Sequence, residues 1–194
     1  GELEYEELIG HLYTLPEQPK AIPYITSYYK ERWGFCLTHE EYNNLQKGTY
    51  YIKIDTNLFD GVLNYGELIL KGKKNKEIFI STYICHPSMA NNELSGPSVV
   101  TYLAKWLTEL KNLEYTYRIV FIPETIGSIS YLSKNINQLQ ENVIAGFNVS
   151  CVGDNRAYSY LPSRNGNTLS DRIAKHILHH IDNNYETYTW LDRG

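Results

Sequence analysis

The hydrophobic pattern is clearest from residue 78 onwards, where apolar runs alternate with amphipathic stretches. Residues 78–84 form a largely apolar run rich in β-branched side chains, which predicts a buried strand. Residues 95–111 carry apolar side chains at helical spacing, and Ser95 is suited to cap that helix. The same pattern predicts, in chain order, a strand at 117–122, a helix at 127–133, a strand at 143–152, a helix at 169–181 and a strand near 186–190. This alternation predicts an α/β fold with a mostly parallel sheet and helices on both faces.

The earlier part of the chain has shorter and more interrupted patterns. Apolar residues at helical intervals predict a short helix within 2–13, which a proline-containing stretch then ends. A brief strand is expected at 25–28. Thr38 and Glu41 have the spacing of a capping box, which predicts one or two helical turns over 38–45.

Alternating polar and apolar residues over 49–58 and 61–70 flank the turn signal Asp60-Gly61. This pattern predicts two or three antiparallel strands joined by a tight turn. We therefore expect a small β-rich module with a short N-terminal helix over residues 1–76, preceding or inserted into an α/β domain over residues 77–194.

Composition limits the class of protein. The chain has 194 residues, of which 42% are hydrophobic, and this is enough to build a core. A net charge of -4 without a long basic block gives no reason to expect nucleic acid. No apolar run approaches the ~20 residues of a membrane span and no signal peptide opens the sequence, so we expect a cytoplasmic protein that does not engage membranes.

The three cysteines are scattered and lack CxxC spacing, which indicates neither a disulfide framework nor a cysteine zinc knuckle. Cys85 beside His86 raises the alternative of a cysteine hydrolase. We disfavour it, because adjacent residues on a strand point to opposite faces.

Two candidate residues follow neighbouring predicted strands. His86 comes after the strand at 78–84, and Glu124 comes after the strand at 117–122. The carboxyl ends of parallel strands share one edge of a sheet, where open α/β sheets place their ligands. An imidazole and a carboxylate on one rim suit a metal ligand beside a general base. The alternatives are a histidine that is only hydrogen-bonded and a glutamate that caps the next helix.

The sequence leaves open the roles of several other polar residues. Asp154 could bind metal, orient a ligand or start a turn. His176, His179 and His180 share a face of the predicted helix at 169–181, but that helix lacks the HExxH pattern, so a solvated face is favoured.

Four segments together resemble a known family: CHPSMANNELSGP at 85–97, PETIGS at 123–128, VGD at 152–154 and YSYLPSR at 158–164. They resemble the aminopeptidase-like domain proteins encoded near bacterial surface-polysaccharide genes. That group resembles a divergent branch of the zinc-dependent aminopeptidases of the bacterial leucyl aminopeptidase and glutamate carboxypeptidase type. The resemblance covers nearly the whole chain and implies a zinc-exopeptidase-like, phosphorylase/hydrolase-like fold. Residues 27–37 and 60–68 are similar to the small β domain inserted in that group.

The resemblance also implies site roles. It makes His86 a zinc ligand and Glu124 the general base that takes a proton from water. It predicts an aspartate where this chain has Asn92, and Glu93 or Asp154 could replace that ligand. Carboxylates of the di-zinc relatives also correspond to Thr125 and to a position near Ser150. We therefore expect at most one zinc ion, because an asparagine lacks the charge that holds Zn²⁺.

Two hypotheses follow. In the first, the chain is a metallo-aminopeptidase-like hydrolase of a small peptide or related amide, with Arg164 or Arg193 receiving a substrate carboxylate. In the second, it is a catalytically inactive binding or accessory module in surface-polysaccharide biosynthesis. The segment at 189–194 resembles a point where family members continue, so we expect the chain to be a fragment. The oligomeric state is left open.

Overall fold

The structure is a computed structural model that describes residues 1–25, 31–57, 59–86 and 89–192. The chain forms two compact units, Gly1–Asp60 and Gly61–Gly194. Each unit is described by itself below. Within the described residues, no helix combines the length and apolar character needed to cross a membrane.

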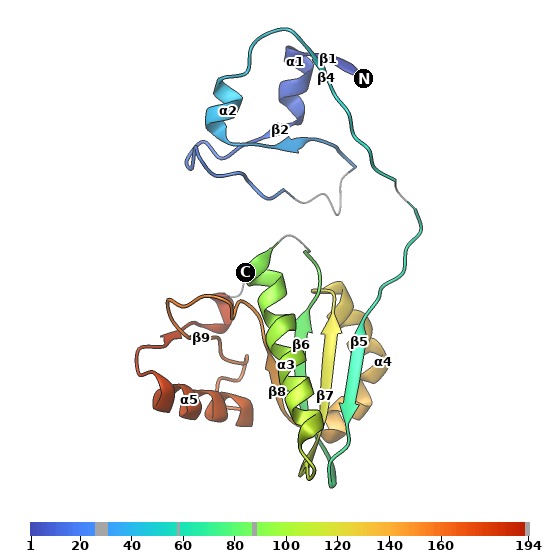
Figure 1. Cartoon of the computed structure of the whole chain (residues 1–194), viewed down its shortest axis with the longest axis vertical. Helices are drawn as coiled ribbons and strands as arrows, with labels where there is room; N and C mark the ends of the chain where they lie inside the picture. Colours follow the sequence, from blue (N-terminus) through green and yellow to red (C-terminus); the bar gives the residue numbers. More distant parts are fainter. Residues whose placement is uncertain (26–30, 58, 87–88, 193–194) are drawn as a thin grey trace. The chain divides into compact units, whose positions relative to one another are not determined.

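The second unit is built on a four-stranded sheet with the order β5-β7-β6-β8 (Figure 1). Its strands are β5 (Gly66–Leu70), β6 (Lys74–Tyr83), β7 (Tyr115–Ile122) and β8 (Val143–Asn148). β6 pairs in parallel with both β7 and β8, whereas β5 pairs antiparallel with β7. The predicted α/β class is confirmed. The carboxyl ends of β6, β7 and β8 lie at one edge of the sheet, as parallel pairing requires.

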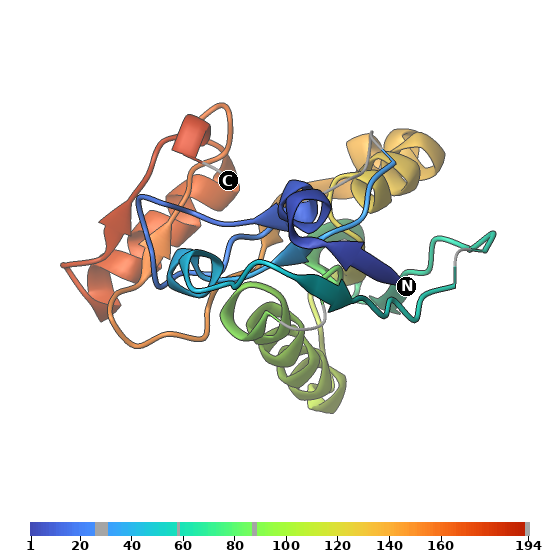
Figure 2. The same cartoon turned by 90° about the horizontal axis from the view of Figure 1, so that it is seen from above.

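Helices α3 (Ser95–Glu109) and α4 (Ile126–Asn142) cover opposite faces of this sheet (Figures 1 and 2). Neighbouring strand residues point to opposite faces, so Ile119 packs in the core on the α3 side and Val120 packs in the core on the α4 side. Both side chains are fully buried. The α3 side contains Ile80, Val100, Ala104 and Leu107, and the α4 side contains Ile122, Tyr131 and Leu139.

The last part of the unit holds α5 (Leu169–Ile181), which lies beside β8. Thr168 and Asp171 form a capping box at its N-terminus, and the helix has the predicted bounds. A small parallel pair, β9 (Ser159–Tyr160) and β10 (Glu186–Thr187), and the 3₁₀ helix η3 (Trp190–Asp192) complete the elements.

The first unit consists of short elements: β1 (Glu2–Glu4), α1 (Tyr5–Leu8), η1 (Ile9–His11), β2 (Leu12–Tyr13), β3 (Phe35–Cys36), α2 (His39–Asn43) and β4 (Thr49–Tyr51). β1 pairs antiparallel with β4, and β2 pairs in parallel with β3. The capping box of Thr38 and Glu41 is confirmed at the start of α2. The short helix predicted over 2–13 is confirmed for residues 5–11, which form α1 and η1, whereas residues 2–4 and 12–13 pair as strands.

The strand pairing predicted around Asp60-Gly61 is wrong. β4 pairs with β1, and β5 pairs with β7, so the two predicted strands are not partners. Since β5 belongs to the main sheet, the compact units divide after Asp60, which differs from the division expected at residue 76. The strand expected at 25–28 lies mostly outside the described residues.

Other boundaries differ less. Ser95 is not the N-cap of α3, because the π-helix η2 (Ala90–Leu94) leads directly into it and Leu94 takes that position. α4 extends well beyond the predicted end, to Asn142, and β8 stops at Asn148.

Candidate metal centre and its adjoining pocket

The candidate centre forms where β6 ends and the chain turns towards η2. Cys85 and His86 follow the strand, and η2 carries Glu93, which is only 2% exposed. Glu93 Oε2 accepts a hydrogen bond of 2.7 Å from the Cys85 backbone N–H, and Glu93 Oε1 lies 2.6 Å from His86 Nδ1. A buried carboxylate needs such partners, so the turn is folded around the Glu93 side chain.

These contacts also set the charge of Glu93. Burial by itself would raise the pKa of this carboxyl. The hydrogen bonds from the His86 ring and from the backbone N–H groups of Cys85 and His86 outweigh that effect, so the pKa lies below its ordinary value. Glu93 is therefore an anion held at the base of the turn.

Glu124 reaches the same place from β7. Its backbone N–H donates a hydrogen bond to Cys85 Sγ, which joins the end of β7 to the turn after β6. The potential ligand atoms of Cys85, His86, Glu93 and Glu124 all lie within 4.8 Å of one another. The structure thus brings together the two residues predicted at this edge, His86 and Glu124, with two additional donors.

This group, which we call the rim cluster, has the donor chemistry of a zinc site. It offers a thiol sulfur, an imidazole nitrogen and two carboxylates, and Zn²⁺ binds these donors at about 2.0–2.3 Å. Four donors within 4.8 Å of one another can converge on one ion after small side-chain rotations. The residues present therefore fit a single zinc ion.

Cys85 is poorly suited to act as a nucleophile. Burial raises the pKa of its thiol, the nearby carboxylates of Glu93 and Glu124 raise it further, and only the N–H of Glu124 opposes them. A neutral thiol is a weak nucleophile, so the raised pKa of Cys85 does not favour a cysteine hydrolase.

Other predicted site residues point elsewhere. The Asn92 side chain donates to Cys151 Sγ at 3.7 Å. Asp154 accepts hydrogen bonds of 3.1 Å from the side chain and from the backbone N–H of Arg156, and these bonds lower the Asp154 pKa. The hydrogen bond from the Arg156 backbone N–H makes Asp154 the first residue of a turn, which was one of the roles expected for it. Asp154 is not one of the four members of the rim cluster.

The remaining candidates give no further support to the site. Arg164 is exposed between β9 and α5, and Arg193 lies outside the described residues, so their contact with a substrate carboxylate stays a prediction. His176, His179 and His180 are exposed on α5, where the ring of His180 packs against those of the other two.

From the sequence, Glu93 was expected only as a replacement ligand, and Cys85 was not expected to bind metal. The sequence feature that could have identified both ligands is a cysteine adjacent to His86 together with an acidic residue on the following helical turn. What the sequence did not reveal is that η2 turns Glu93 back onto both residues.

A pocket of about 320 Å³ adjoins the rim cluster through Glu124. It is lined by the ends of β6 and β8 and by the start of α4, and the side chains are mainly polar. Ser81 Oγ donates to Asn148 Oδ1 at 3.1 Å across the two strands. Burial raises the pKa of Tyr83, another lining residue, to about 12, and its contact with Cys151 adds to this. Tyr83 is therefore a neutral phenol at physiological pH.

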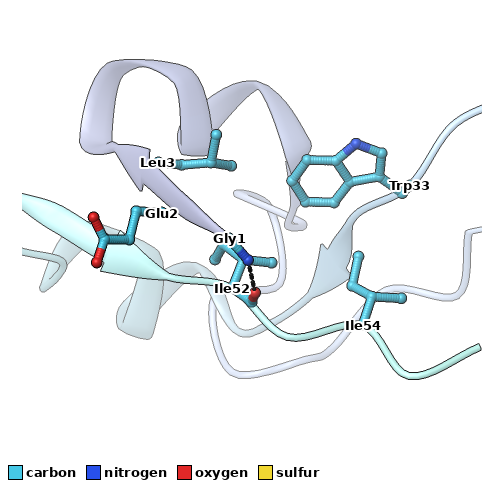
Figure 3. A pocket seen from close by; sticks show the side chains of 6 residues that line it. All are labelled: Gly1, Glu2, Leu3, Trp33, Ile52 and Ile54. Carbon is cyan, nitrogen blue, oxygen red and sulfur yellow. Dashed lines mark hydrogen bonds between the residues drawn. The ribbon is translucent and has the colours of Figure 1, made fainter.

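A second pocket, of about 340 Å³, lies within the first unit (Figure 3). Leu3, Trp33, Ile52 and Ile54 supply its apolar lining, and the Gly1 amine donates to the Ile52 carbonyl at 2.6 Å. The Trp33 ring stacks on His11 with 3.6 Å between ring centroids. The lining lacks a grouping of acid, base and nucleophile, so this pocket suggests no reaction.

Comparison with known proteins identifies relatives. The family described as "Domain of unknown function (DUF4910)" matches residues 13–194. A Clostridium acetobutylicum protein named "Putative polysaccharide biosynthesis protein with aminopeptidase-like domain" is 43% identical over 180 residues, which are 93% of this chain and 41% of that protein. The crystal structure of a "putative peptidase" from the same organism superposes with a TM-score of 0.90 and 41% identity, covering 97% of this chain and 44% of that one. The chain thus spans less than half the length of these relatives, and the resemblance noted in its sequence is confirmed.

Proposed function

The chain belongs to the family described as "Domain of unknown function (DUF4910)", and from this premise we propose that it carries the metal-binding part of a zinc-dependent, aminopeptidase-like hydrolase of peptide or related amide bonds. The names of these relatives, one with an "aminopeptidase-like domain" and one a "putative peptidase", support the reaction class. We also propose the zinc-exopeptidase-like variant of the α/β fold, which the position of the rim cluster at the carboxyl edge of the sheet supports.

The observation that carries the proposal is the convergence of the rim cluster within 4.8 Å. We assign Cys85, His86 and Glu93 as the residues that would hold one zinc ion. Three protein ligands leave an open position, as in catalytic zinc sites. When bound, zinc would polarise the substrate carbonyl and make water a better nucleophile.

Glu124 is the general base in this proposal. It is exposed at the edge of the cluster, so its carboxylate can reach water, take a proton from it and pass that proton to the leaving nitrogen. Water supplies the hydroxyl group that ends on the acyl carbon, and the carbon–nitrogen bond breaks. The 2.6 Å contact between Glu93 and His86 keeps these two donors side by side, and ligation of both side chains to zinc would replace it.

Calorimetric titration of zinc into the full chain tests the proposal. We expect one tight zinc site, and His86→Ala should lower its zinc affinity by about 10- to 100-fold. The matched control is His176→Ala, which removes an exposed histidine on α5 and should leave zinc affinity unchanged. Equal affinity in His86→Ala and the unmodified chain would contradict the assignment.

A second candidate function is a binding or accessory module in surface-polysaccharide biosynthesis that has no catalytic activity. Asn92 supports it, because this neutral side chain stands where the resemblance calls for an aspartate and contacts Cys151 instead. Asn92→Asp separates the two functions. Zinc binding that appears only in Asn92→Asp would favour the accessory module over the hydrolase.

A further inference from the structure

The pocket beside Glu124 differs from the usual small-molecule pocket, whose lining is mostly apolar. Ile122 is one apolar residue of its lining, and the others carry hydroxyl, amide or carboxylate groups: Ser81, Thr82, Tyr83, Glu124, Thr125, Ser128 and Asn148. Hydroxyl and amide groups both donate and accept hydrogen bonds. Such a lining matches a ligand with several hydroxyl groups of its own.

The charged groups in the lining restrict the chemical class of the ligand further. Among the described residues that line it, Glu124 is the one with a formal charge, and neither lysine nor arginine takes part. A phosphate or carboxylate group would meet a carboxylate there and would lack a cationic partner. An apolar peptide side chain would cover the apolar part of the lining but would take water from its hydroxyl and amide groups without replacing those hydrogen bonds. A neutral polyol avoids both penalties.

The pocket has the size of a site for a small ligand. Its volume of about 320 Å³ is near the lower end of the range of ~300–1,000 Å³ found for small-molecule sites. This space suits one sugar ring with a small substituent. The Ser81–Asn148 hydrogen bond of 3.1 Å fixes part of the wall across β6 and β8. A wall that is already oriented binds a ring with little loss of side-chain entropy.

Glu124 belongs both to this pocket and to the rim cluster. We infer that the pocket binds the ring of an amino sugar whose amide substituent extends to the rim cluster, so that the substrate class is a sugar-borne amide. The hydrolytic part of this inference rests on the proposed function. Water is the second substrate: its oxygen bonds to the acyl carbon, the bond from that carbon to the sugar nitrogen breaks, and the products are a carboxylic acid and a free amino sugar.

The relative named for polysaccharide biosynthesis is consistent with such a ligand, but the lining of the pocket carries the argument. An amino sugar of this kind must be supplied by a reaction that acylates the sugar nitrogen. The freed amine would be consumed by a reaction that uses an unprotected amino sugar.

Binding of N-acetyl-D-glucosamine and N-acetyl-D-galactosamine to the full chain, measured by saturation-transfer NMR, tests the inference. We expect saturable binding of at least one of them, weakened tenfold or more in Ser128→Leu, which fills the pocket from the first turn of α4. Ser133→Leu places the same side chain at an exposed position of α4 and should bind like the unmodified chain. Asn148→Ala, which removes a polar group without filling space, guards against misfolding of the first variant and should also weaken binding.

Zinc titration of the same samples distinguishes the sugar-binding inference from the hydrolase proposal. Zinc binding without saturable sugar binding, or sugar binding that survives both pocket variants, would overturn the inference and leave the hydrolase proposal intact. Sugar binding in a chain that binds no zinc would support the pocket assignment and overturn the hydrolase proposal. With zinc bound, release of acetate from the bound sugar, lost in Glu124→Gln, is the expected result for both.

Discussion

Arg118 and Glu77 form a buried, two-bonded ion pair between β7 and β6. Arg118 Nε donates to Glu77 Oε2 over 2.7 Å, and Arg118 Nη2 donates to Glu77 Oε1 over 3.1 Å. Each residue is only 2% exposed. Arg118 also donates to Glu67 on β5 over 2.7 Å, and Glu67 accepts from the Tyr131 hydroxyl on α4. One guanidinium thus links three strands of the sheet, with α4 joined through Tyr131.

Replacing Arg118 by methionine should destabilise the second unit by about 3–5 kcal/mol, because it leaves the Glu77 carboxylate buried without its partner. Urea unfolding followed by circular dichroism measures the effect. The double variant Arg118→Met/Glu77→Met should recover most of the loss. Glu114→Gln, which removes an exposed partner of Lys74, is the control and should leave the unfolding midpoint unchanged. A single Arg118→Met variant as stable as the control would contradict the importance of this pair.

Zinc should stabilise the chain if it binds the rim cluster. At a free zinc concentration 100 times the dissociation constant, the free energy of unfolding should rise by about 2.7 kcal/mol. Thermal unfolding with and without zinc gives the shift, and a chelator should reverse it. At the same zinc concentration, a 10- to 100-fold weaker affinity in His86→Ala should reduce the shift to about 0.4–1.4 kcal/mol. An equal shift in that variant would place the ion elsewhere.

Gly96 tests how closely α3 approaches the sheet. A Cβ at this position would collide with the Val149 carbonyl oxygen and with Thr82 Oγ1. Gly96→Ala should therefore destabilise the second unit by about 1–3 kcal/mol, although alanine is the better helix former. Gly61→Ala is the control, since its Cβ would meet nothing within 4 Å. Stabilisation by Gly96→Ala would show that α3 lies farther from Val149 and Thr82 than these contacts require.

Asp171 should make the stability of the α5 region depend on acid pH. This buried carboxylate accepts hydrogen bonds from Tyr160, Ser163 and Thr168. Burial would raise its pKa, but these bonds outweigh burial and hold the pKa below the ordinary value.

Because the folded pKa of Asp171 is depressed, its contribution is complete above the unfolded pKa of about 3.9 and is lost as the pH falls from there towards the folded value. The difference in unfolding free energy between the unmodified chain and Asp171→Asn should therefore be constant near neutral pH and shrink below about pH 4. Chemical denaturation across that range checks the trend, with Glu141→Gln, an exposed position on α4, as the control. A difference independent of pH would contradict the role of the charge.

The sequence determined the local features of this protein. Apolar periodicity over short windows was enough to predict the strand that became β6 and the bounds of α5, and the spacing of Thr38 and Glu41 was enough to predict the cap of α2. These features depend on contacts between residues a few positions apart, which the pattern records directly. The meeting of His86 and Glu124 was also within reach, because parallel strands bring their carboxyl ends to one edge.

Only the tertiary structure decided which distant segments are partners. β5 has the pattern of a hairpin strand, yet it pairs with β7, where Glu67 reaches Arg118 and Leu68 and Leu70 pack partly buried against the core. In the same way, Glu93 joins the rim cluster because η2 turns it back onto Cys85 and His86, a contact between backbone and side chain that no periodicity encodes. Pairing and burial depend on the summed free energy of contacts far apart in the chain, so they are fixed only when the whole unit is assembled.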